Sequence, residues 1–124
     1  MIFGIGVDIV HTQRMERWCK QPHLLERYFH PDEIATSVSR GERAAHSLAG
    51  RFAAKEAFGK ALGTGLAGIA LKDIMVTTYS NGRPELRICG TALEALKKSR
   101  ANRVHLSISH DKDNAVAMVV LEVL

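Results

Sequence analysis

The sequence has little cysteine and no long apolar run. Its two cysteines, Cys19 and Cys89, belong to no Cys-x-x-Cys or Cys/His ligand pattern, which excludes a disulfide scaffold and a zinc site of the usual spacing. No basic leader with a cleavage site opens the chain, and no apolar run reaches the about 18 residues that span a bilayer. These absences predict a cytoplasmic protein with reduced thiols and no membrane partner.

Aromatic residues are also few, with one Trp, two Tyr and four Phe. The 17 Lys and Arg exceed the 13 Asp and Glu, which suits an acidic protein, a phosphate-bearing ligand or a nucleic acid. A nucleic-acid-binding module is suggested by Arg14, Arg17, Lys20 and Arg27, but no aromatic residue lies beside a basic strand. We therefore keep that module as an alternative and expect no nucleic acid partner.

The order of apolar and polar residues predicts one domain over residues 1–124. Strand patterns occupy residues 2–10, 73–79, 85–89, 104–110 and 115–123. The first is expected to be buried, and the last to be buried on both sides for much of its length. Helical patterns begin near Gln13, with Thr12 as a cap, and occupy residues 31–41, 42–62 and 91–99. The mixture predicts an α+β fold, with a mainly antiparallel sheet packed against a long central helix.

Glu56 stands out because it lies in the apolar arc of the longest predicted helix. At about 100° per residue it falls between Phe52 and Ala49 on the helical wheel. An unpaired carboxylate in that arc would cost several kcal/mol, so a cation or a metal ion should face it. Lys60 lies one turn further on, and an ordinary surface ion pair between Glu56 and Lys60 is the simpler alternative.

Asp8 is a second carboxylate in an apolar segment, the first predicted strand. Two carboxylates on separate elements suit Mg²⁺, which keeps several waters and takes other ligands from substrate phosphates. A side-chain cap on the next turn is the alternative for Asp8. Lys60 and the loop Gly63-Thr64-Gly65 would then face phosphate, although a glycine pair after a helix is often only its C-cap.

Ser107, Ser109 and His110 form a polar cluster on the strand of residues 104–110. The cluster lacks a nucleophile elbow, and His110 has no acid placed to orient it, so covalent serine catalysis is disfavoured. The hydroxyl groups are better interpreted as hydrogen-bonding groups for a ligand, or else as solvated residues of the strand.

In four blocks the chain resembles bacterial holo-acyl-carrier-protein synthases, the small type of 4′-phosphopantetheinyl transferase. The blocks are residues 4–9, 51–65, 81–84 and 107–110. The resemblance implies the fold of these transferases and transfer of 4′-phosphopantetheine from coenzyme A to a serine of apo-acyl carrier protein, in support of fatty acid biosynthesis. Adenosine 3′,5′-bisphosphate would be released. A magnesium-dependent phosphohydrolase that acts on coenzyme A alone is a further alternative.

The resemblance also assigns roles to residues. It implies that Asp8 and Glu56 hold Mg²⁺ and act in catalysis with Lys60, which contacts a phosphate of coenzyme A. The other residues implied for the coenzyme A pocket are Arg51, Gly63, Thr64, Gly65, Pro84, Ser109 and His110. The acceptor of the serine proton stays open between Glu56 acting through a metal-bound water, Asp32 and Glu33.

Two partners follow from the same resemblance. Family members are homotrimers whose coenzyme A sites lie between neighbours, with Asp8, Glu56 and Lys60 from one subunit and Pro84 and His110 from the next. The acidic carrier protein would dock on the basic first helix. The docking residues implied there are Arg14, Lys20 and Leu24.

Overall fold

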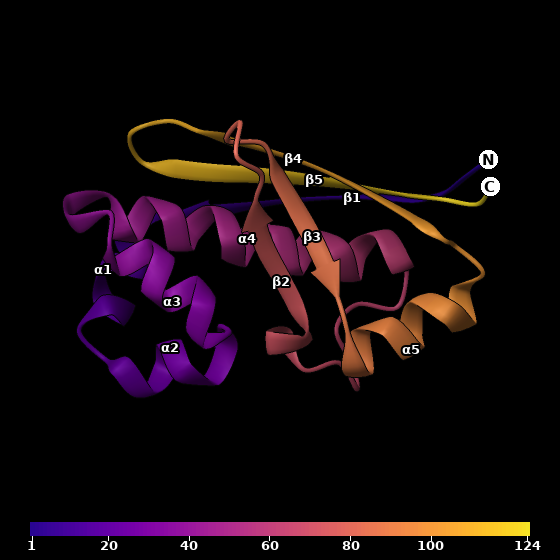
Figure 1. Ribbon diagram of the computed structural model, residues 1–124, viewed down its shortest axis with the longest axis horizontal. Coiled ribbons are helices and arrows are strands. Elements are labelled where there is room, and N and C mark those ends of the chain that lie inside the picture. The colour runs from indigo at the N-terminus through magenta and orange to yellow at the C-terminus, as the bar shows by residue number, and fades with distance from the viewer.

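The long helix α4 (Ala44–Leu62) is the centre of the computed structural model, which describes residues 1–124 (Figure 1). The strands are β1 (Ile2–His11), β2 (Ile74–Thr78), β3 (Pro84–Ile88), β4 (Arg103–His110) and β5 (Asn114–Glu122). The other helices are α1 (Thr12–Cys19), α2 (Pro22–Tyr28), α3 (Pro31–Val38) and α5 (Gly90–Ser99), with 3₁₀ turns η1 (Gly41–Arg43) and η2 (Leu71–Asp73). The predicted α+β class is confirmed.

The strands form two antiparallel sheets where we expected one. β1, β5 and β4 form a sheet in that order, and β2 pairs only with β3. The first sheet covers one side of α4, whereas β2 lies across another side, and the two chain ends lie next to each other (Figure 1). The loop that contains Asn81 and Gly82 joins β2 to β3, and Gly82 has a φ of 88°.

β1 lies unusually close to the backbone of α4. A Cβ atom added to Gly4 would lie 2.0 Å from the carbonyl oxygen of Ala61, and one added to Gly6 would lie 2.0 Å from that of Ala57. Only glycine leaves room for this approach. The Gly-x-Gly pattern of β1 therefore serves packing between strand and helix.

The expectation that residues 2–10 form a fully buried strand is wrong. The side chains of Ile5, Val7 and Ile9 point away from α4 and are 57%, 50% and 63% exposed. β5 is buried or half-buried along most of its length, as expected, and Met118 is its one exposed residue, at 46%. The reason is that α4 covers one face of the sheet, while alternate residues of each strand point to the other face.

α4 has no single apolar face, because most of its circumference is buried. It begins at Ala44, after η1, and ends as predicted at Gly63, whose φ of 84° is left-handed. Glu56 is only half-buried and Lys60 is exposed, so Glu56 lies at the edge of the packed surface.

The first helical region divides at Pro22, as its sequence indicates. Its N-cap is His11 and not Thr12, which is the first helical residue and has a buried hydroxyl without a partner. No helix in the structure has the length and apolar character needed to cross a membrane.

Candidate active site

Asp8 and Glu56 lie near each other, where β1 crosses α4. Asp8 is on the inward face of β1, the face of Gly4 and Gly6, and its side chain is 18% exposed. Lys60 Nζ donates to Asp8 Oδ1 at 2.9 Å and to the carbonyl oxygen of Val7 at 3.0 Å. The ordinary ion pair between Glu56 and Lys60 is therefore not formed, and Lys60 instead ties α4 to β1.

The surroundings of Glu56 disfavour its charge. Burial raises the pKa of Glu56, the nearby Asp8 carboxylate raises it further, and Lys60 and Arg14 oppose both effects. A cation between the two carboxylates would relieve this repulsion. Because the structure has no group of three or more His, Cys, Asp or Glu placed for a metal ion, a metal held by Asp8 and Glu56 would need outside ligands. This donor set fits Mg²⁺ with water and phosphate oxygens.

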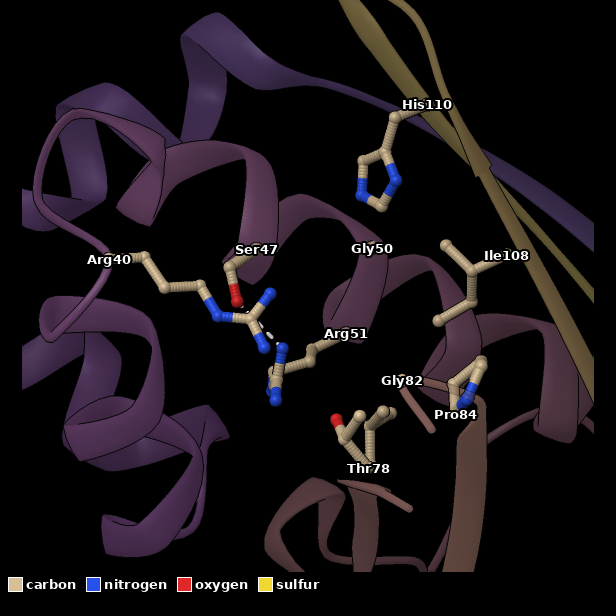
Figure 2. Close-up of a pocket in the computed structure, with 10 residues that line it drawn as sticks. Arg40, Ser47, Gly50, Arg51, Thr78, Gly82, Pro84, Ile108 and His110 are labelled. Carbon is tan, nitrogen blue, oxygen red and sulfur yellow. Dashed lines mark hydrogen bonds between the residues drawn. The ribbon is translucent and has the colours of Figure 1, made fainter. Parts of the chain in front are cut away.

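Three other predicted residues line a separate cavity of about 220 Å³. Arg51 comes from α4, Pro84 from the start of β3 and His110 from the end of β4, and Figure 2 shows them around one space. Arg40 also lines this cavity and was missed in the sequence, because it lies in the connection before η1 and belongs to no motif. Two arginines and a histidine make the cavity suitable for an anion.

Arg51 is almost fully buried, and one hydrogen bond anchors its guanidinium. Its Nη1 donates to Ser47 Oγ at 2.6 Å, while its Nε is buried without a partner. Burial lowers the pKa of Arg51, and the charge of Glu33 raises it in part. An arginine nevertheless stays protonated in a protein, so Arg51 brings a buried positive charge to the cavity.

His110 closes the cavity from the side of β4. Its Nε2 lies 3.1 Å from the carbonyl oxygen of His46. Burial lowers the pKa of His110, the hydrogen bond to the His46 backbone opposes this effect, and the nearby charges of His46, Arg43 and Arg40 lower the pKa further. At Gly50 an added Cβ would lie 2.8 Å from His110 Nε2, so the absence of a side chain on α4 makes room for the ring.

Not all the predicted residues meet at these two places. Ser109 points to the opposite face of β4 from Ile108 and His110, and it does not line the cavity. In the loop after α4, the Gly65 N–H donates to the carbonyl oxygen of Gly59 at 3.0 Å, so this loop does serve as a helix cap. The exposed Thr64 lies in that loop.

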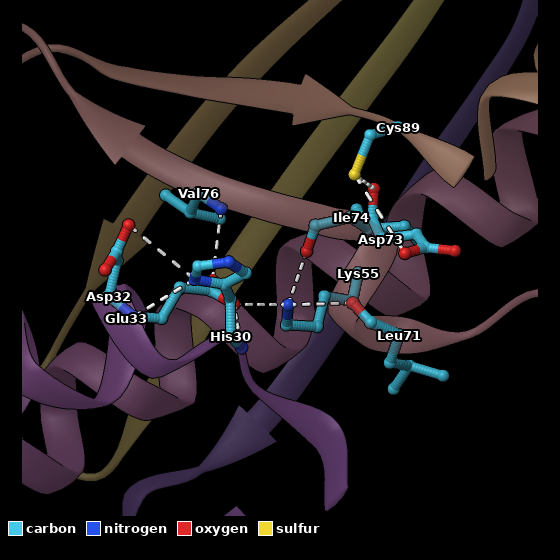
Figure 3. Close-up of polar contacts among 9 residues, drawn as sticks. All are labelled: His30, Asp32, Glu33, Lys55, Leu71, Asp73, Ile74, Val76 and Cys89. Carbon is cyan, nitrogen blue, oxygen red and sulfur yellow. Dashed lines mark hydrogen bonds and ion pairs between the residues drawn. The ribbon is translucent and has the colours of Figure 1, made fainter. Parts of the chain in front are cut away.

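Glu33, one of the three candidate proton acceptors, is unsuited to that role. Lys55 Nζ donates to Glu33 Oε1 at 2.7 Å, and the Val76 N–H donates to Oε2 at 3.0 Å (Figure 3). Both carboxylate oxygens are therefore occupied in a fully buried ion pair. Asp32, the neighbouring candidate, has a mostly exposed side chain.

The residues predicted for docking lie together on α1 and α2. The Arg14 guanidinium lies 5.0 Å from the ring centre of Trp18 and 4.9 Å from that of Phe52. Lys20 is exposed at the end of α1, and Leu24 is half-buried on α2. Arg14 is thus presented on an aromatic surface, and its charge also acts on Glu56.

Comparison with known proteins identifies the family. The model of the 4′-phosphopantetheinyl transferase superfamily matches residues 4–119. A holo-[acyl-carrier-protein] synthase of Treponema denticola is 54% identical over 122 residues, which cover 98% of this chain and 99% of that protein. The chain belongs to the holo-[acyl-carrier-protein] synthase family of this superfamily.

Solved structures agree with this assignment. The synthase of Neisseria meningitidis has a TM-score of 0.88 at 36% identity, covering 98% of this chain and 99% of that one. A synthase of Bacillus anthracis in complex with CoA (3′,5′-ADP) has a TM-score of 0.83 at 39% identity, and the match covers 100% of this chain and 99% of that one. The fold implied by the sequence resemblance is thereby confirmed.

Proposed function

We propose that this protein transfers 4′-phosphopantetheine from coenzyme A to a serine of apo-acyl carrier protein and releases adenosine 3′,5′-bisphosphate. The observation that carries the proposal is the pairing of two sites of opposite charge preference. Asp8 and Glu56 suit a cation, and the cavity of Arg40, Arg51 and His110 suits an anion. A ligand that carries a pyrophosphate and a separate phosphate, as coenzyme A does, has groups for both.

Asp8 and Glu56 are the residues that would hold Mg²⁺. When bound, Mg²⁺ neutralises charge on phosphate oxygens as the leaving phosphate departs. Lys60 donates to Asp8 and to the Val7 carbonyl oxygen, and it can direct its third N–H group to the same phosphates. Arg51, supported by Ser47, and Arg40 would hold the other end of coenzyme A, with Gly63, Thr64 and Gly65 beside Lys60.

Glu56 is the best-placed acceptor for the proton of the attacking serine, acting through an intervening water. The other two candidates lie on α3: Glu33 is paired with Lys55, and the side chain of Asp32 is mostly exposed.

We further propose a homotrimer whose active sites lie between subunits. Glu56 and Arg51 are five residues apart on α4, which places them about 140° apart around the helix at about 100° per residue. One coenzyme A molecule would therefore contact the Asp8 side of one subunit and the Pro84 and His110 side of its neighbour. The exposed apolar residues of the sheet supply the surface for association, and light scattering measures its stoichiometry.

The central test mixes the protein with Mg²⁺, coenzyme A and an apo-acyl carrier protein and measures the mass of the carrier. We expect the mass to rise by one phosphopantetheine. Asp8→Asn and Glu56→Gln should each abolish the adduct while the protein stays folded and associated, because each removes one of two metal ligands. An unmodified carrier would refute the proposal, and release of phosphopantetheine without carrier would favour the phosphohydrolase.

A salt titration of binding to random DNA tests the nucleic-acid alternative. Tight binding with a steep salt dependence would support that alternative. We expect weak binding, because Arg14 lies over Trp18 and Phe52 and Arg27 over Tyr28, on helices and not along a strand with aromatic residues for base stacking.

A further inference from the structure

Two polar residues of α3 meet three polar residues of α4 inside the protein. Glu33 and Ser37 are one turn apart on α3, while Ser47, Arg51 and Lys55 follow at one-turn intervals on α4. Ser37 Oγ and Ser47 Oγ are 2.8 Å apart, and Ser47 Oγ accepts from Arg51. All five side chains are buried, so their charges must be balanced among themselves or by a ligand.

Glu33 carries the only negative charge among the five, and it forms an ion pair with Lys55. Lys55 Nζ lies 2.7 Å from Glu33 Oε1 and also donates to the carbonyl oxygens of Leu71 and Ile74 (Figure 3). Glu33 Oε1 further accepts from the His30 N–H at 3.1 Å. Lys55 is therefore held in place by three acceptors, and it is the cation that pairs with the Glu33 carboxylate.

Arg51 is left without a carboxylate. None of the ion pairs in the structure includes Arg51, although Arg51 and Glu33 line the same cavity of about 290 Å³ between α3 and β2. Arg51 also lines the anion-suited cavity beside His110. Its guanidinium therefore lies between a carboxylate that is already paired and a space that can take a ligand.

We propose that Lys55 is a positioning residue that occupies Glu33 and thereby keeps Arg51 free for a phosphate group of the ligand. Without Lys55, Glu33 would be a buried and unpaired charge. Arg51, the remaining cation of the group, would then pair with it, because guanidinium and carboxylate form a strong two-bond contact. The guanidinium would turn toward α3 and away from the ligand cavity. The inference rests on the proposed function, which supplies the phosphate ligand.

The test measures affinity for adenosine 3′,5′-bisphosphate by calorimetry in four proteins: the unmodified chain, Lys55→Met, Glu33→Gln and the double variant Glu33→Gln/Lys55→Met. We expect Lys55→Met to bind about ten- to one-hundredfold more weakly, the effect of losing one charge-assisted hydrogen bond. Glu33→Gln and the double variant should bind within about threefold of the unmodified protein, because neither contains a carboxylate that could attract Arg51.

A purely structural role for the ion pair makes the opposite prediction, namely that Glu33→Gln and the double variant bind as weakly as Lys55→Met. That result, or unchanged binding by Lys55→Met, would overturn the inference. If Lys55→Met does not fold, Lys55→Gln takes its place, because it removes the charge but keeps a donor for the buried carbonyl oxygens: weakened binding that Glu33→Gln restores in the double variant supports the inference, and unchanged binding contradicts it. Failure of the unmodified protein to bind the nucleotide would instead count against the proposed function.

Discussion

A methyl group at position 6 would collide with the main chain of α4. In Gly6→Ala the added Cβ would lie 2.0 Å from the carbonyl oxygen of Ala57 and 2.7 Å from the amide nitrogen of Ala61. Close carbon–oxygen contacts in proteins are about 3.3 Å, so β1 would have to move from α4 by more than about 1 Å. No change of rotamer relieves the clash, because both obstructing atoms belong to the backbone.

The expected loss of stability is at least about 3 kcal/mol, the upper end of the usual range for overpacked cores. Asp8 lies two residues further along β1 on the same face, so the displacement would also move its carboxylate relative to Glu56. We therefore expect the Gly6→Ala protein to lose both unfolding free energy and transfer activity.

Urea unfolding followed by circular dichroism measures the first effect, at one fixed protein concentration because association contributes to stability. Gly68→Ala is the matched control. Gly68 has a φ of 75° but nothing within 4 Å of an added Cβ, so this substitution should cost only the about 1–2 kcal/mol of a left-handed residue. The reasoning fails if Gly6→Ala is no less stable than Gly68→Ala.

Three further predictions concern the carrier surface, the sheet face and the histidine of the cavity. Arg14→Glu should raise KM for the carrier while leaving coenzyme A affinity unchanged, because it reverses a charge held on the Trp18 ring. Steady-state kinetics in which the carrier and coenzyme A are varied in turn distinguish an effect on one substrate from an effect on the other. Val7→Asp should dissociate the proposed trimer in light scattering, because Val7 is 50% exposed on the apolar sheet face; a trimer that stays intact would exclude that face as the interface. Burial, aided by Arg43 and Arg40, holds the pKa of His110 below its usual 6.5. As the pH falls through 6.5, the unfolded chain therefore takes up a proton at His110 that the folded protein does not, and the free energy of unfolding falls. His110→Gln should therefore lose less unfolding free energy than the unmodified protein between about pH 7.5 and pH 5.5; an equal loss in urea unfolding would contradict the assignment.

The sequence was sufficient to locate both carboxylates of the candidate metal site. Asp8 and Glu56 interrupt apolar patterns, and such interruptions are visible because burial of a charge requires a partner. The end of α4 at Gly63 and the alternation of β4 were also predictable, since each depends on neighbours along the chain. The family resemblance named Arg51, Pro84 and His110, and they do line one cavity.

Residues that act through distant neighbours were not predictable. Glu33 and Lys55 are 22 positions apart, and nothing near Glu33 distinguishes it from an ordinary acidic residue in the first turn of a helix. Arg40 enters the cavity because η1 brings the chain back to α4. These contacts depend on how α3 and α4 pack together, which the local pattern does not contain.

The sequence by itself determined most of the elements, the end of the long helix and the presence of two carboxylates in apolar segments. These properties follow from local conformational preferences and from the cost of burying charge, which act residue by residue. Tertiary structure alone decided that Lys60 pairs with Asp8, that Lys55 and not Arg51 pairs with Glu33, and that the outer face of β1 is exposed. Competition among charges and the covering of a sheet face depend on which elements meet in space.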